Sequence, residues 1–99
     1  MEPTYIIVDG EMGGTGLREK YRPLDLEPGD LGISDGLQSR IREWLLEYER
    51  AYHSNFTNEV ENMNLDAKGV EIAKCVKQEL PSAEVSYYSS VTLCELPLE

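Results

Sequence analysis

The sequence predicts an α+β domain in which two helices cover a small sheet of two to four strands. An apolar, β-branched run at residues 4–8 and a β-branched and aromatic segment at residues 83–96 are typical of strands. Two stretches between them repeat apolar residues with the period of a helix. The expected order is strand, long loop, helix, helix and strand, with a further strand if the last segment folds back. The 99 residues have the length of one domain, so we expect a single domain over residues 1–99.

The first strand, TYIIV at residues 4–8, ends at the turn pair Asp9-Gly10. Its apolar side chains fall on both faces, which is typical of a central strand. Residues 10–32 then show no helical period and contain many glycines, and a loop of this length is uncommon in a compact domain. We therefore expect a short strand inside it, at LREKY (17–21) or YRPLDL (21–26).

Residues 35–53 carry the strongest local signal and predict a helix. Ser34 can cap its amino end by accepting a backbone N–H. The apolar residues of this stretch recur at the spacing of one helical face: Leu37, Ile41, Trp44, Leu45, Tyr48 and Tyr52. The charged residues of the opposite face pair at three- and four-residue separations, so we expect that face to be solvated.

A second helix is expected from Asp66, as its N-cap, through Leu80, with Pro81 ending it. The preceding stretch, SNFTNEVENMN at residues 54–64, is polar and has no consistent period, so it is interpreted as a connection. Phe56 is expected to attach this connection to the core.

The two predicted helices are expected to pack through small residues. Gly69 and Ala73 lie four positions apart on the apolar stripe of the second helix and leave space for a bulky neighbour. Trp44 or Tyr48 of the first helix is the expected neighbour. Of the two, we predict that Trp44 contacts Gly69 and Ala73.

Residues 83–96 consist of two alternating runs on either side of Ser89-Ser90. They predict either a hairpin or one long bent strand, because Ser-Ser lacks the positive φ preference of two-residue hairpin turns. Tyr87 and Tyr88 are consecutive, so they point to opposite faces and we expect one of them to be exposed. The first and last strands are expected to lie side by side in parallel.

The chain is strongly acidic. Nine basic and nineteen acidic side chains give a formal net charge of −10. A nucleic-acid backbone demands the opposite charge, so we expect no nucleic-acid partner. An acidic surface attracts basic partners, although acidity also keeps many cytosolic proteins soluble.

The sequence predicts a cytoplasmic protein without a membrane partner. It contains no apolar run of membrane-spanning length, and its amino-terminal residues lack the pattern of a signal peptide. Cys75 and Cys94 lack the spacing of a metal or redox motif, so both are expected to be reduced, partly buried thiols.

The stretch GEMGGTGLREK, residues 10–20, raises the question of phosphate binding. A P-loop places a lysine directly after its last glycine and a helix immediately afterwards. Here Leu17 takes the lysine position, and the first predicted helix begins far downstream. The loop is therefore not expected to bind nucleotides, but Arg18, Lys20 and Arg22 leave weaker anion binding open.

No other pattern predicts catalysis, a cofactor or a metal. His53 is the sole histidine, and it has no second histidine or cluster of thiolates to complete a metal site. No serine lies in a nucleophile-elbow pattern, and the acidic stretch DLEPGDLGISD departs from the spacing of a calcium loop. We expect no catalytic, cofactor-binding or metal-binding residue, and no enzymatic activity.

The candidate partner-binding residues are acidic or aromatic: Asp25, Glu27, Asp30, Asp35 and Tyr88. The four carboxylates are close in sequence and lack paired basic neighbours, and an exposed tyrosine beside carboxylates is a typical anchor of a protein interface. The alternative is that these carboxylates only cap turns and the following helix.

Three stretches, YIIVDGEMGGTG, DLGISDGLQSRIREWLLEYE and GVEIAKCVKQELPSAEVSYYS, resemble small bacterial immunity proteins of secreted polymorphic toxins, including contact-dependent growth inhibition systems. The resemblance covers most of the chain in layout and transfers no site residue. It implies a small cytosolic protein that neutralises one cognate toxin, expected to be a basic nuclease, by blocking its active-site cleft. The alternative is a regulatory domain that binds a small molecule or anion through residues 10–20.

Overall fold

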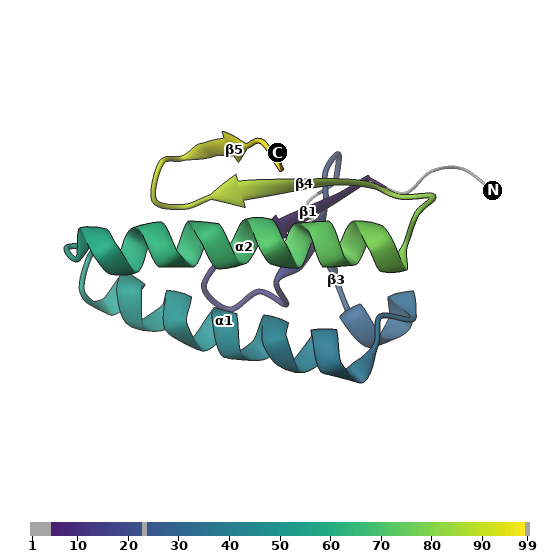
Figure 1. Ribbon diagram of the computed structural model, residues 1–99, viewed down its shortest axis with the longest axis horizontal. Coiled ribbons are helices and arrows are strands. Elements are labelled where there is room, and N and C mark those ends of the chain that lie inside the picture. The colour runs from purple at the N-terminus through teal and green to yellow at the C-terminus, as the bar shows by residue number, and fades with distance from the viewer. Residues whose placement is uncertain (1–4, 23, 99) are drawn as a thin grey trace.

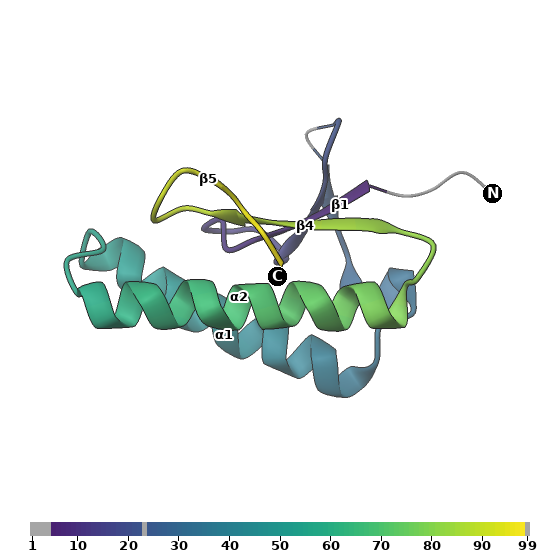
Figure 2. The same cartoon turned by 45° about the horizontal axis from the view of Figure 1, so that its top comes forward.

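The computed structural model describes residues 5–22 and 24–98 and has two layers. Helices α1 (Asp35–His53) and α2 (Glu59–Glu79) lie side by side and cover one face of a sheet (Figure 1). The sheet lies above the two helices when the molecule is turned (Figure 2). The predicted α+β class with two helices on a sheet is confirmed.

The sheet has five strands rather than two to four. They are β1 (Tyr5–Asp9), β2 (Leu17–Glu19), β3 (Asp25–Leu26), β4 (Glu84–Ser89) and β5 (Cys94–Leu96), in the spatial order β3-β2-β1-β4-β5. The predicted parallel pairing of the first strand with the last long strand is confirmed between β1 and β4, and the other pairs are antiparallel. Thr4, the first residue of the predicted strand, lies outside the described residues.

The long loop contains two of these strands and a short helix. β2 and β3 fall within the two stretches where a short strand was expected, and η1 (Pro28–Leu31), a 3₁₀ turn, follows β3. The two strands are so short that only their pairing with β1 and with each other defines them. The strand count was therefore underestimated.

Helix α1 has the predicted bounds, but the N-cap of α2 lies eight residues before the predicted N-cap. The side chain of Asn58, and not that of Asp66, caps α2 by accepting a hydrogen bond from the Glu61 N–H (3.0 Å). Val60 and Met63 are exposed, while Asn62 faces inward and donates to the Phe56 carbonyl (2.8 Å). Because a polar residue faces inward and apolar residues face solvent here, the sequence of this stretch does not show the period of a helix. The expected connection is therefore largely helix, although Phe56 does pack against the core as predicted.

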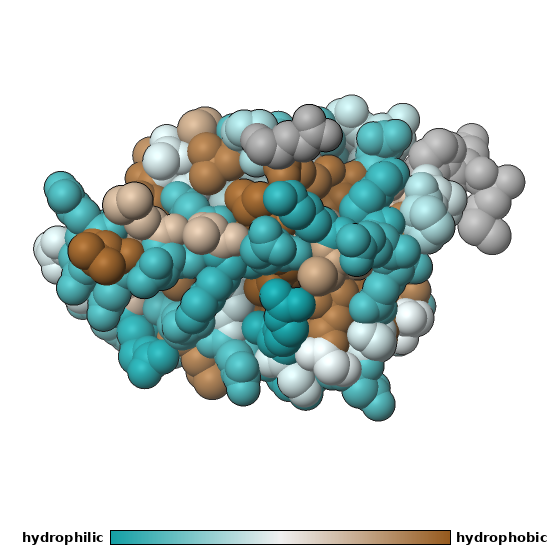
Figure 3. Space-filling view, viewed as in Figure 1, coloured by the Kyte–Doolittle hydropathy of each residue, from teal (hydrophilic) through white to brown (hydrophobic). Residues whose placement is uncertain are grey.

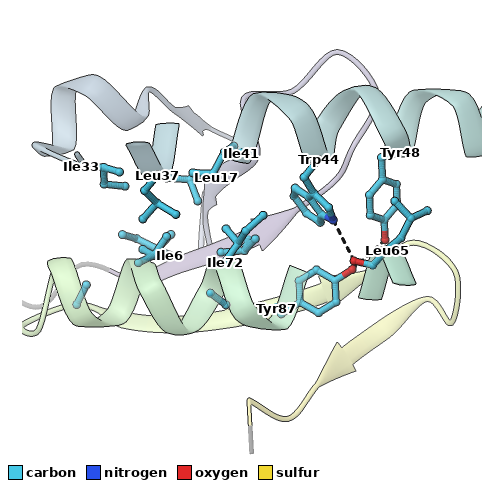
Figure 4. Packing of buried hydrophobic residues seen from close by; sticks show 14 of the residues in the cluster. Ile6, Leu17, Ile33, Leu37, Ile41, Trp44, Tyr48, Leu65, Ile72 and Tyr87 are labelled. Carbon is cyan, nitrogen blue, oxygen red and sulfur yellow. Dashed lines mark hydrogen bonds between the residues drawn. The ribbon is translucent and has the colours of Figure 1, made fainter. Parts of the chain in front are cut away.

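The partner of Gly69 is Tyr87 of β4, not Trp44. A Cβ placed on Gly69 would lie 2.3 Å from Cε1 of the Tyr87 ring. Trp44 instead donates from Nε1 to the Leu65 carbonyl (3.0 Å) and lies edge-on to Tyr48, with ring centroids 5.0 Å apart (Figure 4). The glycine in α2 therefore lets the helix approach the sheet rather than the other helix.

Strands β4 and β5 form a hairpin, which decides between the two predicted alternatives. The chain turns over residues 90–93, and the Ser89 hydroxyl accepts hydrogen bonds from the backbone N–H groups of Val91 (3.2 Å) and Thr92 (3.1 Å). The hydroxyl of the first serine thus supplies the turn stabilisation that a Ser-Ser pair lacks in its own backbone preferences.

Candidate functional site

Residues 10–16, the glycine loop, lie directly against α1. A Cβ on Gly10 would be 2.4 Å from Cδ2 of Tyr48, and a Cβ on Gly16 would be 2.5 Å from Cγ2 of Ile41. Gly16 also has a φ of 92°, which residues with a side chain rarely adopt. The loop leads into β2 and not into a helix. Gly10 and Gly16 therefore serve close packing on α1, and the helix N-terminus on which a P-loop depends does not follow the loop.

The three basic side chains that follow this loop in the sequence each contact a carboxylate. Arg18 donates from Nε to Asp9 (2.7 Å), and Arg22 donates from Nη2 to Glu19 (2.8 Å). Lys20 Nζ lies 3.8 Å from a Glu95 carboxylate oxygen. All three cations have an acidic neighbour in the same chain. The geometry therefore gives little support to the alternative that this loop binds an anion.

The four predicted carboxylates are all exposed and lie along one segment. Asp25 is in β3, Glu27 precedes η1, Asp30 lies within η1, and Asp35 is the first residue of α1. Among the described residues, no basic side chain lies within ion-pair distance of any of them. We call these four residues the acidic segment. Their predicted role in partner binding stays a prediction.

Tyr88 lies apart from Glu27 and Asp30, on the face of the sheet that points away from the helices. Tyr87 is buried under α2, so its neighbour Tyr88 points to the opposite side. The ring of Tyr88 is half-buried, and the Arg18 guanidinium carbon lies 5.6 Å from its centroid. Tyr88 is therefore partly covered by a cation of the same chain.

Sequence reasoning missed a groove between the glycine loop and α1. One hollow of about 350 Å³ is lined by Glu11 and Met12 of the loop and by Leu45, Leu46 and Glu49 of α1. A second hollow of about 370 Å³ shares Gly14 and Leu45 with the first. We call the two hollows together the α1 groove. One signal was present in the sequence, because Leu46 is a leucine outside the apolar stripe of its helix.

The second hollow brings part of the acidic segment to the groove. Its lining includes Glu27 and Asp30 from the segment around η1, and Gln38 and Arg42 from α1. Asp25 lies nearby, with its Oδ1 atom 3.8 Å from the position of a Cβ on Gly14. The structure therefore gathers three of the predicted residues beside the glycine loop, while Asp35 begins α1 and Tyr88 lies on the open face of the sheet.

A buried polar network joins α1 and α2 to the β4–β5 hairpin. The Tyr87 hydroxyl donates to Asp66 Oδ1 (2.7 Å) and lies 3.0 Å from the Tyr48 hydroxyl, while the Ser89 hydroxyl donates to Asp66 Oδ2 (3.0 Å). Burial is the main cause that raises the pKa of the Tyr48 and Tyr87 hydroxyls above the ordinary value of tyrosine. Both therefore stay protonated and act as hydrogen-bond donors or acceptors that hold the two layers together.

The remaining candidates for chemistry are isolated. His53 is exposed, and its Nε2 atom lies 3.9 Å from Glu49. Cys75 and Cys94 are free thiols, and Cys94 is exposed rather than partly buried as expected. Over residues 5–22 and 24–98, no group of three or more histidine, cysteine or acidic side chains could hold a metal ion. No helix in the described part of the chain is long and apolar enough to cross a membrane.

The comparison with protein families supports one of the two functional hypotheses drawn from the sequence. The family model of Serratia CdiI immunity protein-like proteins matches residues 7–90, which include the glycine loop, the acidic segment and both helices. The chain belongs to this family. The immunity protein gives no significant match to a curated protein or to a solved structure. The resemblance to immunity proteins of contact-dependent growth inhibition is thereby confirmed, and the role of the chain is to neutralise a toxin.

Proposed function

We propose that this immunity protein neutralises a basic nuclease toxin by placing its acidic segment across the cleft that would otherwise bind nucleic acid. One observation carries the proposal. The four exposed carboxylates of the segment have no basic partner among the described residues, whereas Arg18, Lys20 and Arg22 all contact carboxylates of the chain. The surplus negative charge is therefore available to a partner.

Charge of this sign fits the chemistry of a nuclease cleft. A site that binds phosphates is lined by lysine and arginine, and carboxylates can take the places of those phosphates. Such inhibition needs binding alone and no catalytic step by the immunity protein. It takes place in the cytoplasm, where the toxin meets nucleic acid. Tyr88 stays a predicted contact, although Arg18 already covers part of its ring.

Charge neutralisation tests the proposal. In the first variant all four residues of the acidic segment are changed to Asn or Gln. The control variant neutralises four exposed carboxylates elsewhere that also lack an ion pair among the described residues: Glu43, Glu59, Glu61 and Glu84. Both variants lose the same net charge, so a difference between them reports position and not total charge.

The measurement is stopped-flow association with the cognate toxin domain. We expect the association rate of the acidic-segment variant at low salt to fall by ~10-fold or more, because local charge steers the encounter. The control variant should lose much less. The rate for the parent protein should fall as salt rises, because the Debye length shrinks to ~8 Å at physiological ionic strength. An acidic-segment variant that is folded and associates as fast as the control would refute the proposal.

A nuclease assay tests the nature of the toxin. The proposal predicts that the isolated toxin domain degrades DNA or RNA and that equimolar immunity protein stops the cleavage. A toxin domain without nuclease activity, or one that still binds nucleic acid in the complex, would contradict the proposed mechanism.

A further inference from the structure

We propose that the toxin docks in the α1 groove, with Met12 and Leu46 as the apolar centre of the interface. This inference rests on the proposed function and names the surface that performs it. The expected occupant is a segment of the toxin that is rich in lysine or arginine.

The groove exposes apolar side chains that belong to two different elements. Met12 of the glycine loop is 51% exposed and Leu46 of α1 is 60% exposed, and both line the same hollow. Half-buried Leu45 forms part of both hollows. Exposed apolar side chains around a concave surface are typical of the centre of a protein interface, where most of the binding energy arises.

The rim of the groove selects a basic partner. Glu11 and Glu49 line the first hollow, and Glu27 and Asp30 line the second. Among the residues that the structure describes, Arg42 is the sole basic side chain in the lining of the two hollows, and it donates to the Ser39 hydroxyl (3.1 Å). A lysine or arginine side chain matches this arrangement, because its aliphatic stem can cover Met12 and Leu46 while its charged end reaches the rim.

The groove is already formed in the free protein. Gly10 and Gly16 pack on α1 without room for a side chain, as the contacts above show. Both ends of the glycine loop are also joined by a hydrogen bond from the Asp9 N–H to the Gly16 carbonyl (2.9 Å). A preformed surface loses little conformational entropy on binding, which favours tight association.

Two other surfaces fit a basic partner less well. A hollow of about 250 Å³ between α1 and α2 contains Arg50 and Lys68, and Lys68 already pairs with Glu47 at 2.7 Å. The outer face of α2 is mostly hydrophilic (Figure 3). Its first turns expose Val60 and Met63, which offer a matched control for Leu46 and Met12.

The experiment compares two double variants that remove similar exposed apolar groups. The groove variant carries Met12→Ala and Leu46→Ala, and the control variant carries Val60→Ala and Met63→Ala. Binding is measured by isothermal titration calorimetry with the cognate toxin domain. We expect the groove variant to raise the Kd by ~10-fold or more, as for truncation of interface hot spots. The control should stay within about twofold of the parent, and circular dichroism should show both variants folded.

Charge removal at Arg42 gives an independent test that needs no truncation of the apolar centre. The Arg42→Gln variant removes the cation from the groove, so it should associate faster with the toxin domain.

A groove variant that binds like the control, or an Arg42→Gln variant that associates more slowly, would overturn the inference. If the groove variant binds normally while neutralisation of the acidic segment slows association, only this inference fails. If neither change affects binding, the proposed function fails as well.

Discussion

Gly69→Ala is expected to destabilise the protein, although alanine is the better helix former. The new methyl group would lie 2.3 Å from Cε1, 2.5 Å from Cζ and 2.8 Å from the hydroxyl oxygen of Tyr87. That ring is fully buried, and its hydroxyl is held by Asp66 at 2.7 Å and by Tyr48 at 3.0 Å. The ring can move away only by disturbing these hydrogen bonds.

The expected loss follows from three contributions. Overpacking of a core contact costs ~1–3 kcal/mol. Leaving a buried hydrogen-bonding group of this network without its partner costs a further ~1–3 kcal/mol. The higher helix propensity of alanine returns about 1 kcal/mol. The free energy of unfolding should therefore fall by ~1–5 kcal/mol, and the Tm should fall by ~4–8 °C for each kcal/mol.

Urea unfolding followed by circular dichroism measures this change, with Gly36→Ala as the matched control. Gly36 lies in the first turn of α1, and a Cβ placed there meets no atom of the described residues within 4 Å. This control should keep or raise the free energy of unfolding by up to ~1 kcal/mol. Equal stabilisation by the two substitutions would refute the close approach of α2 to Tyr87.

Three further predictions concern the loop and the helix ends. Gly16→Ala should lower the free energy of unfolding by ~2–4 kcal/mol, because a φ of 92° and contact with Ile41 both oppose a side chain; an unchanged urea midpoint would contradict the packing of the glycine loop. Asn58→Ala should cost ~1 kcal/mol by removing the cap of α2, and unchanged stability would place the start of α2 elsewhere. The pKa of Glu79 is lowered by hydrogen bonds from the Ser34 N–H and hydroxyl. Its charged form therefore stabilises the fold above its ordinary pKa, and this contribution is lost as the pH falls through the lower pKa of the folded state. Glu79→Gln should accordingly lower the urea midpoint at pH 7 and much less at pH 3, and an equal effect at both pH values would contradict this role.

The sequence was most informative where short-range signals agree. Ser34 and the apolar spacing that follows it predicted α1 with its observed bounds, because the cap and the buried face depend on neighbouring residues. The amino-terminal half of α2 was missed, since Asn62 faces inward while Val60 and Met63 face solvent. The inward amide of Asn62 donates to the Phe56 carbonyl, while its Oδ1 atom has no hydrogen-bond partner among the described residues. No local sequence pattern predicts this contact.

The candidate site could also be predicted only in part from the sequence. Glu27 and Asp30 could be singled out because the acidic segment is continuous in sequence. The α1 groove could not be predicted, since it depends on how the glycine loop packs on α1. The glycines indicated an unusual backbone conformation. That Gly10 and Gly16 allow close packing on Tyr48 and Ile41 is seen only in the folded structure.

Carboxylate labelling of the free protein and of its toxin complex tests the central claim most directly. A carbodiimide couples an amine to accessible carboxylates, and mass spectrometry measures the modification of each residue. We predict that binding of the toxin domain strongly reduces labelling of Glu27, Asp30 and Glu49 and leaves Glu61 and Glu84 labelled as in the free protein. Protection of Glu61 or Glu84, with unchanged labelling at Glu27, Asp30 and Glu49, would contradict the account.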